Sequence, residues 1–183
     1  MCSMSTFGRR RRRDGARGQS LAEFAIVAPI FFLLVFSVIQ LGLVFGTQNG
    51  LVNGVREAAR RAATYRINDG SFDATVWSSI CATIEAEVTQ LGDRTIPAYD
   101  DTRINPDVTY EWVANPESGD YFLVAHVSAT YDHPLYVPLV SYFLDSSDGT
   151  NNGVMTLSAS EQMRVENPAL EYTSAPAAPP ACP

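Results

Sequence analysis

The stretch of sequence that decides the fold is FAIVAPIFFLLVFSVIQLGLVF, residues 24–45. It contains no charged residue, and only Ser37 and Gln40 have polar side chains. As an α-helix its 22 residues would rise about 33 Å, enough to cross a hydrocarbon core of about 30 Å. A segment that stands alone in lipid must be helical, because only a helix satisfies its own backbone groups there. The sequence therefore predicts a single transmembrane helix.

Basic residues gather on the N-terminal side of this span. Residues 1–18 hold six Arg and one Asp, a net charge of +5, whereas the rest of the 183-residue chain has a net charge of −12. An excess of Arg before the span predicts a cytoplasmic N-terminus and an acidic, extracytoplasmic remainder. The acidic remainder argues against nucleic acid as a partner, because phosphate binding needs a basic surface. The lipid bilayer is the partner that the span itself requires.

The N-terminal region also has simpler interpretations. A secretory signal peptide would be followed by a site of the small-x-small kind, but GTQNGLVNG after Phe45 offers no good site. A twin-arginine signal fits poorly, because the Arg run is followed by DGARGQ rather than by an apolar residue. The Arg run could also serve only as a topology anchor.

An acidic residue, Glu23, stands at the cytoplasmic edge of the span. A carboxylate that enters the apolar region costs a few kcal/mol unless it reaches the interface or finds a cationic partner. One interpretation is that Glu23 reaches the headgroups and is favoured by the helix dipole. The other is that cleavage after Gly18 removes the basic leader and makes Glu23 the fifth residue of the product. The new ammonium group of one subunit could then be neutralised by Glu23 of its neighbour.

These residues carry a family resemblance. The pattern G-x-x-x-x-E-F, here Gly18, Glu23 and Phe24 before a long apolar helix, resembles the processing site of type IV pilin-like proteins of the Tad type. GQSLAEFAIVAPIFFLLVFSVIQLG, followed by NGLVNGVREAARRAATYR, is similar to the start of TadE-like pilus-assembly proteins. Residues 156–166 resemble that family's terminal strand more loosely.

The resemblance implies a structural role as a pseudopilin or minor pilin in Tad-type pilus assembly. It implies that a prepilin peptidase cuts between Gly18 and Gln19 and that Glu23 and Phe24 take part in subunit registration. The other implied partners are further pilins and Tad secretion components. The implied location is the cytoplasmic membrane, crossed once, or the pilus itself.

A row of small residues recurs every four positions at the end of the span and beyond it. Such a row lets another helix approach closely, and its drift of about 40° per step favours a neighbour that crosses at an angle. It predicts packing against sibling or partner helices. Alternatively, Gly is simply common in membrane helices, or the four glycines let the helix unwind near its exit. The members of the row are Gly42, Gly46, Gly50, Gly54, Ala58 and Ala62.

The remainder of the chain predicts a small outer domain. A second helix is expected over residues 73–91 with Gly92 as its stop, and strands are expected over 108–114, 121–131 and 154–165. The regular alternation of the second strand indicates one buried face, so the strands are expected to form an antiparallel meander. The link 132–153 contains two prolines and the tract DSSDGTNNG, which is typical of an exposed loop.

The predicted fold class is therefore α+β. A long N-terminal helix, first transmembrane and then solvent-exposed, precedes a small helix and an antiparallel sheet, and the resemblance implies a pilin-like arrangement. Pro29 is the only strong helix breaker from residue 21 to 66, and it should kink the helix. The predicted divisions are a basic leader (1–18), the helix and its extension (19–67), an outer α+β domain (68–171) and a Pro/Ala-rich tail (172–183).

Two of the three cysteines lie outside the leader. Cys81 and Cys182 make an even count in an exported domain, so they could form a disulfide that ties the tail to the second helix. The alternative is a buried thiol at Cys81 and a mobile one at Cys182.

Patterns for catalysis or metal binding are missing from the sequence. His126 and His133 have no Cys or carboxylate at metal-site spacing, and the tract from Asp145 has Thr156 where an EF-hand needs an acid. The motifs of hydrolases, zinc proteases and phosphate loops are missing as well. We therefore expect no enzyme activity, metal or cofactor. The rival to a structural role is a permanently anchored extracytoplasmic binding module, which would keep its leader.

Overall fold

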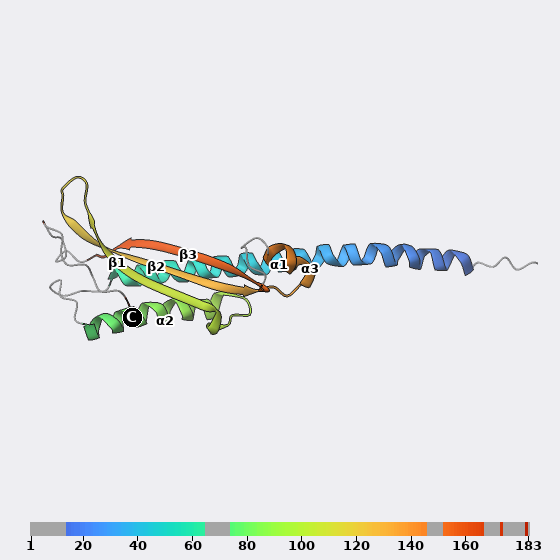
Figure 1. Cartoon of the computed structure of the whole chain (residues 1–183), viewed down its shortest axis with the longest axis horizontal. Coiled ribbons are helices and arrows are strands. Elements are labelled where there is room, and N and C mark those ends of the chain that lie inside the picture. The colour runs from blue at the N-terminus through green and yellow to red at the C-terminus, as the bar shows by residue number, and fades with distance from the viewer. Residues whose placement is uncertain (1–13, 65–73, 146–151, 167–172, 174–181, 183) are drawn as a thin grey trace, which may run out of the picture.

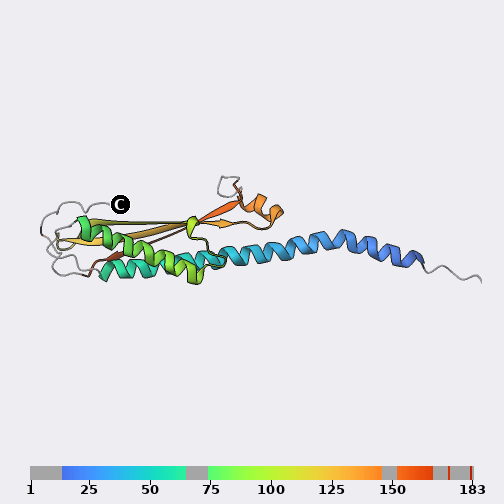
Figure 2. The same cartoon turned by 90° about the horizontal axis from the view of Figure 1, so that it is seen from below.

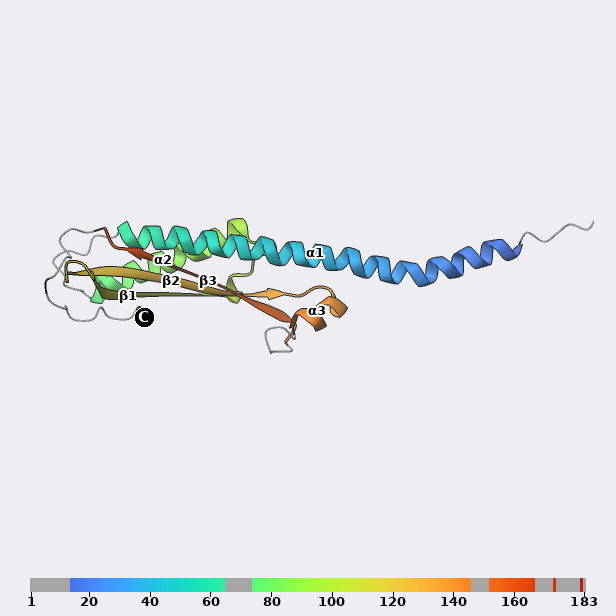
Figure 3. The ribbon, with the colours of Figure 1, turned by 90° about the horizontal axis from the view of Figure 1, so that it is seen from above.

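The computed structural model describes residues 14–64, 74–145, 152–166, 173 and 182 (Figure 1). Its first element, α1, is a helix of 51 residues (Asp14–Thr64). The other elements lie beside the C-terminal half of α1, so that its N-terminal half projects alone (Figures 1 and 3). They are α2 (Ala74–Thr95), the 3-10 helix η1 (Asp101–Arg103), β1 (Ile104–Ala114), β2 (Tyr121–Pro134), α3 (Pro138–Asp145) and β3 (Val154–Arg164). We call the part formed by these elements and the C-terminal half of α1 the head.

The three strands form one antiparallel sheet in the order β1-β2-β3. β1 pairs with β2 from Ile104 opposite Tyr131 to Ala114 opposite Tyr121. β3 pairs with the other edge of β2. The predicted antiparallel meander is confirmed. β1 begins four residues earlier than expected and includes Pro106, which is tolerated because β1 is an edge strand.

Two helices cover one face of this sheet. α1 and α2 lie side by side (Figure 2), α1 against β2 and β3, and α2 against β1. The predicted alternation of β2 supplies the face that meets them, because its odd-numbered side chains point toward the helices. The buried residues of this series are Leu123, Ala125, Val127, Ala129, Tyr131 and His133. The chain therefore has the predicted α+β class, with a long helix before a small helix and a three-stranded sheet.

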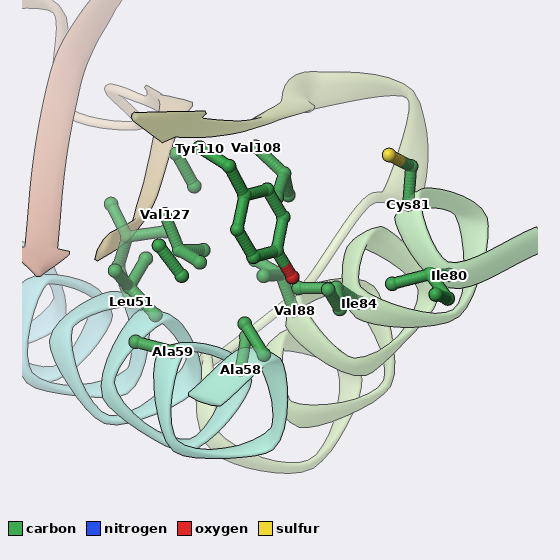
Figure 4. Packing of buried hydrophobic residues seen from close by; sticks show 14 of the residues in the cluster. Leu51, Ala58, Ala59, Ile80, Cys81, Ile84, Val88, Val108, Tyr110 and Val127 are labelled. Carbon is green, nitrogen blue, oxygen red and sulfur yellow. The ribbon is translucent and has the colours of Figure 1, made fainter. Parts of the chain in front are cut away.

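The hydrophobic core lies between the helix pair and the sheet. In Figure 4 the Tyr110 ring points from the sheet toward Ala58 of α1 and Ile84 of α2. The ring also contacts Trp77, with 4.8 Å between ring centroids. Small alanines on α1 let the second helix and the aromatic rings come close, so α1 serves as a core helix in this half. Its fully buried alanines are Ala58, Ala59 and Ala62.

α1 changes character along its length. Most of its large apolar side chains from Leu21 to Leu41 are exposed, whereas Val44, Leu51 and Val55 are buried in the head. The helix bends in its blue N-terminal third, the part that contains Pro29 (Figures 2 and 3). A proline inside a helix removes one backbone hydrogen bond and clashes with the preceding turn, which accounts for a bend there.

Two expectations about the outer domain are wrong. α2 does not stop at Gly92 but continues to Thr95, and Ile96 N–H still bonds to Gly92 O. Gly92 is needed for another reason: a Cβ there would come within 2.7 Å of the Tyr99 ring. Pro97 then disfavours further helix.

The link 132–153 is not a plain exposed loop. β2 extends to Pro134, and residues 138–145 form α3. The predicted helix stop at 68–70 lies outside the described residues, and so does the tail except for Thr173 and Cys182.

Candidate functional site

The residues predicted to guide processing and assembly lie in the projecting half of α1. Gln19, Glu23 and Phe24 are exposed, and Gly18 stands within the first turns of the helix. The Gln19 side-chain amide donates a hydrogen bond of 3.2 Å to Glu23 Oε1. The Glu23 carboxylate therefore lies against the side chain of Gln19, one turn nearer the N-terminal end of the helix.

The apolar span that follows is mostly exposed up to Ile39, and the head covers it in part from Gln40 onward. Ile26 is 71% exposed and Ile39 is still 53% exposed. Exposing so many large apolar side chains to water costs about 25 cal/mol per Å² of apolar surface, so this surface needs a non-aqueous surrounding. The span is long and apolar enough to cross a bilayer, which supports anchoring of the chain in a membrane by one helix.

The small-residue row divides into two parts. A Cβ on Gly50 would lie 2.9 Å from Ile96 Cγ1, and a Cβ on Gly54 would lie 3.6 Å from Leu91 Cβ. Gly46 faces Pro97, and Ala58 and Ala62 are fully buried. α1 stays helical through all of these positions, so the glycines do not unwind it. The close neighbour of Gly46, Gly50 and Gly54 is thus α2, or the turn after it, in the same chain.

Gly42 differs from the rest of the row. A Cβ there would have no neighbour within 4 Å among the described residues. Packing of a sibling helix against the row remains a prediction, and Gly42 is the member whose surroundings leave room for it.

Gly50→Val should destabilise the head. The new side chain would press on Ile96, on Thr95 Oγ1 and on the Thr95 carbonyl carbon, which is part of the backbone. Overpacking of this kind costs about 1–3 kcal/mol. Urea unfolding of the full chain in detergent micelles measures the loss. The matched control Gly42→Val should stay within about 0.5 kcal/mol of the parent. Equal stabilities for the two variants would disprove this account of the row.

The structure joins Cys81 and Cys182 by a disulfide, with 5.6 Å between their Cα atoms. Cys81 lies on α2 and is buried within the core. The bond closes a loop of 101 residues, which includes the whole sheet. It therefore holds residue 182 against the second helix of the head.

A buried polar cluster that sequence reasoning missed lies where the head meets the apolar span. It consists of Gln40 and Thr47 from α1, His133 from the end of β2, and the backbone of Tyr136. The three side chains are almost completely buried. Two signals were available: Gln40 is a lone amide in an apolar span, and His133 continues the buried series of β2 by one step. The sequence did not indicate that the two residues lie close together, because 93 residues separate Gln40 from His133.

The hydrogen bonds of this cluster fix the protonation of His133. The Thr47 hydroxyl donates to Leu43 O at 2.9 Å, so its oxygen accepts from His133 Nδ1 at 3.0 Å. His133 Nε2 then accepts from the Gln40 amide at 3.5 Å, and Gln40 Oε1 accepts from Tyr136 N–H at 3.0 Å. Every group is paired when the imidazole is neutral. A second proton, on His133 Nε2, would bring an N–H donor of the ring against the N–H donor of the Gln40 amide.

The head should lose stability as the pH falls below about 6.5. Burial, and then the positive charge of Arg103, lower the pKa of His133 below its ordinary value. The unfolded chain therefore takes up the proton first, so the free energy of unfolding falls once the pH drops below about 6.5. Thermal unfolding at a series of pH values measures the slope. His133→Gln should flatten the profile in this window, and an unchanged slope would show that His133 does not cause it.

The described residues contain no group of three or more His, Cys, Asp or Glu side chains that could hold a metal ion. The Asp145 carboxylate, at the start of the calcium-like tract, accepts the backbone N–H groups of Asn152 and Gly153. Its two oxygens thus close a turn of the backbone.

Comparison with known proteins bears on the projecting helix and the first part of the head. The model of the TadE-like protein family matches residues 18–60. Searches of curated proteins and of solved structures found no match to this chain. The matched segment begins at Gly18, contains the whole apolar span and ends among the buried alanines of α1. It contains Gly18, Glu23, Phe24 and the apolar span, which carry most of the resemblance seen in the sequence, so this part of the chain is similar to the TadE-like protein family.

Proposed function

We propose that this chain is a structural pseudopilin or minor pilin of a Tad-type pilus. α1 holds it in the cytoplasmic membrane with the head outside, a prepilin peptidase removes residues 1–18, and the processed subunit assembles with other pilins and Tad components. The similarity of residues 18–60 to TadE-like proteins supports an association with Tad pili and a structural role. Processing, orientation and incorporation are our inference.

The observation that carries the proposal is that the two halves of α1 differ in exposure. One continuous helix is bare and apolar in its first half and forms the core of a head in its second half. A subunit of this shape can rest in a bilayer through its bare half. It can then exchange lipid for the bare halves of other subunits, because lipid tails and packed apolar side chains are similar surroundings.

Two features support cleavage after Gly18. Glycine costs a helix about 1 kcal/mol relative to alanine, so the turn that contains Gly15 and Gly18 opens easily to a peptidase. The Glu23 carboxylate points toward this turn through its bond to Gln19. An ammonium group created on Gln19 would therefore appear on the side to which a carboxylate of this or a neighbouring subunit is directed.

Replacing Gly18 should block processing. In the cells that produce the protein, Gly18→Leu should keep residues 1–18, accumulate in the membrane and yield no pili. Gly15→Leu is the matched control, because it makes the same change three residues upstream and should be processed normally. Intact mass and electron microscopy of pili measure the two effects. Normal processing of Gly18→Leu would contradict the proposed site, and an uncleaved parent chain would favour an anchored binding module.

A further inference from the structure

The head exposes large apolar side chains in one place. Among the described residues outside α1, the exposed ones are Tyr136, at 55%, and Tyr142, at 69%. Both belong to residues 134–145, which we call the interfacial segment. The segment reads PLYVPLVSYFLD and comprises the end of β2, a short connection and α3. Exposed apolar side chains that gather in one segment can mark a contact with another molecule or with a membrane.

The segment also lacks free charge. Asp145 is its single charged residue, and that carboxylate is 7% exposed and accepts the N–H groups of Asn152 and Gly153. From residue 134 to 144 the sequence has no charged side chain. The segment can therefore leave water without carrying an unpaired charge with it.

The position of the segment along α1 points to its partner. Tyr136 N–H donates to Gln40 Oε1 at 3.0 Å, and Gln40 lies within the apolar span 24–45. Gln40 stands 17 residues after Glu23, about 26 Å along the helix, whereas a hydrocarbon core is about 30 Å thick. With Glu23 at one boundary of the bilayer, Tyr136 would lie close to the other boundary. Figures 1 and 3 show that α3 is the element of the head nearest to the projecting half of α1.

The residue types suit this depth. Tyrosine is enriched at the membrane–water interface, because its ring is apolar and its hydroxyl is wet. Gln40 would be costly in lipid with its amide unpaired, but His133 and Tyr136 satisfy it. The head thus covers the amide of Gln40 and holds Tyr136 next to it along α1.

We propose that the interfacial segment docks into the leaflet nearer the head, in the bilayer that α1 crosses. Tyr136, Tyr142 and the exposed side of α3 lie among the headgroups and the first methylene groups of the lipid. α1 alone would leave the head free to tilt and turn, and this second contact sets its orientation on the membrane. The inference rests on the proposed membrane anchoring by α1.

Spin labels on the full chain in phosphatidylcholine–phosphatidylglycerol vesicles test the proposal. Single cysteines replace Tyr142, Tyr136, Leu34 in the apolar span, or Glu117, an exposed residue in the β1–β2 turn at the opposite end of the head. Cys2→Ser removes the competing thiol in every variant. Collisions with oxygen, which partitions into lipid, are compared with collisions with a water-soluble nickel complex.

We expect the oxygen-to-nickel ratio at positions 142 and 136 to rise well above that at 117 and to remain below that at 34. This order should persist when the lipid-to-protein ratio is raised. Nickel accessibility at 142 and 136 equal to that at 117, with 34 still in lipid, would overturn the docking but keep the anchor. A ratio at 142 that falls on dilution in lipid would overturn it in favour of contact with a sister subunit. Nickel accessibility at 34 would overturn both docking and anchoring.

Discussion

Glu23→Ala should leave the chain inserted in the membrane and processed, but should abolish or strongly reduce pilus assembly. An ionised carboxylate at the centre of a membrane helix costs about 2.5–3.5 kcal/mol, and less near the interface. Its removal therefore makes insertion no harder. In the assembled state the same carboxylate would balance the ammonium group on Gln19 of a neighbour, and its loss leaves that charge unpaired in an apolar surrounding. A loss of about 1.4 kcal/mol weakens each subunit contact about tenfold.

One further variant separates the charge of the Glu23 side chain from its shape, and a second variant is a control at another carboxylate. Glu23→Gln keeps the length of the side chain and can still accept from the Gln19 amide, but it cannot neutralise an ammonium group. It should assemble as poorly as Glu23→Ala. Glu117→Ala removes an exposed carboxylate from the β1–β2 turn and should assemble normally. Counts of pili per cell, together with membrane levels of the protein, measure the outcome. Normal pili from Glu23→Gln would exclude the pairing of charges.

Cys182→Ser should lower the free energy of unfolding of the head by about 2–5 kcal/mol. The disulfide closes a loop of 101 residues, and in the chain-entropy model a loop of this length restricts the unfolded chain by nearly the upper end of that range. Cys182 is the better position to change, because serine at buried Cys81 would also place a hydroxyl in the core. Urea unfolding followed by the fluorescence of Trp77, which packs on Tyr110, reports on the head.

The controls for the disulfide use the third cysteine and a reductant. Cys2→Ser should leave the unfolding curve unchanged. Reduction of the parent chain should move its curve onto that of Cys182→Ser. If alkylation of the unreduced protein modifies both Cys81 and Cys182, the bond is absent from the native protein and the predicted loss of stability has no basis.

The parts of the fold that the sequence predicted are those set by local pattern. A charge-free run of 22 residues is long enough to dictate a helix by itself. The alternation from Tyr121 to Tyr131 dictates a strand with one buried face and determines which side chains meet the helices. The disulfide could be proposed but not decided, because pairing depends on distance in the folded chain.

The parts that were missed depend on contacts between distant residues. In the sequence Gly92 resembles a helix stop, but in the structure it is needed because the Tyr99 ring packs against it. The prolines at 134 and 138 suggest a loop, but Pro138 stands at the first position of α3, where a missing N–H costs nothing. The cluster of Gln40, Thr47 and His133 forms only because β2 returns to α1 near the apolar span. None of these contacts has a local signature.

We propose that the working subunit begins at Gln19. The most direct measurement is the intact mass of the protein purified from the membranes of the cells that produce it. We expect a mass that lacks residues 1–18, with an ammonium group on Gln19 and the Cys81–Cys182 bond in place. A mass that still includes the arginine-rich leader would contradict it, because the charge that Glu23 is proposed to balance would then not exist.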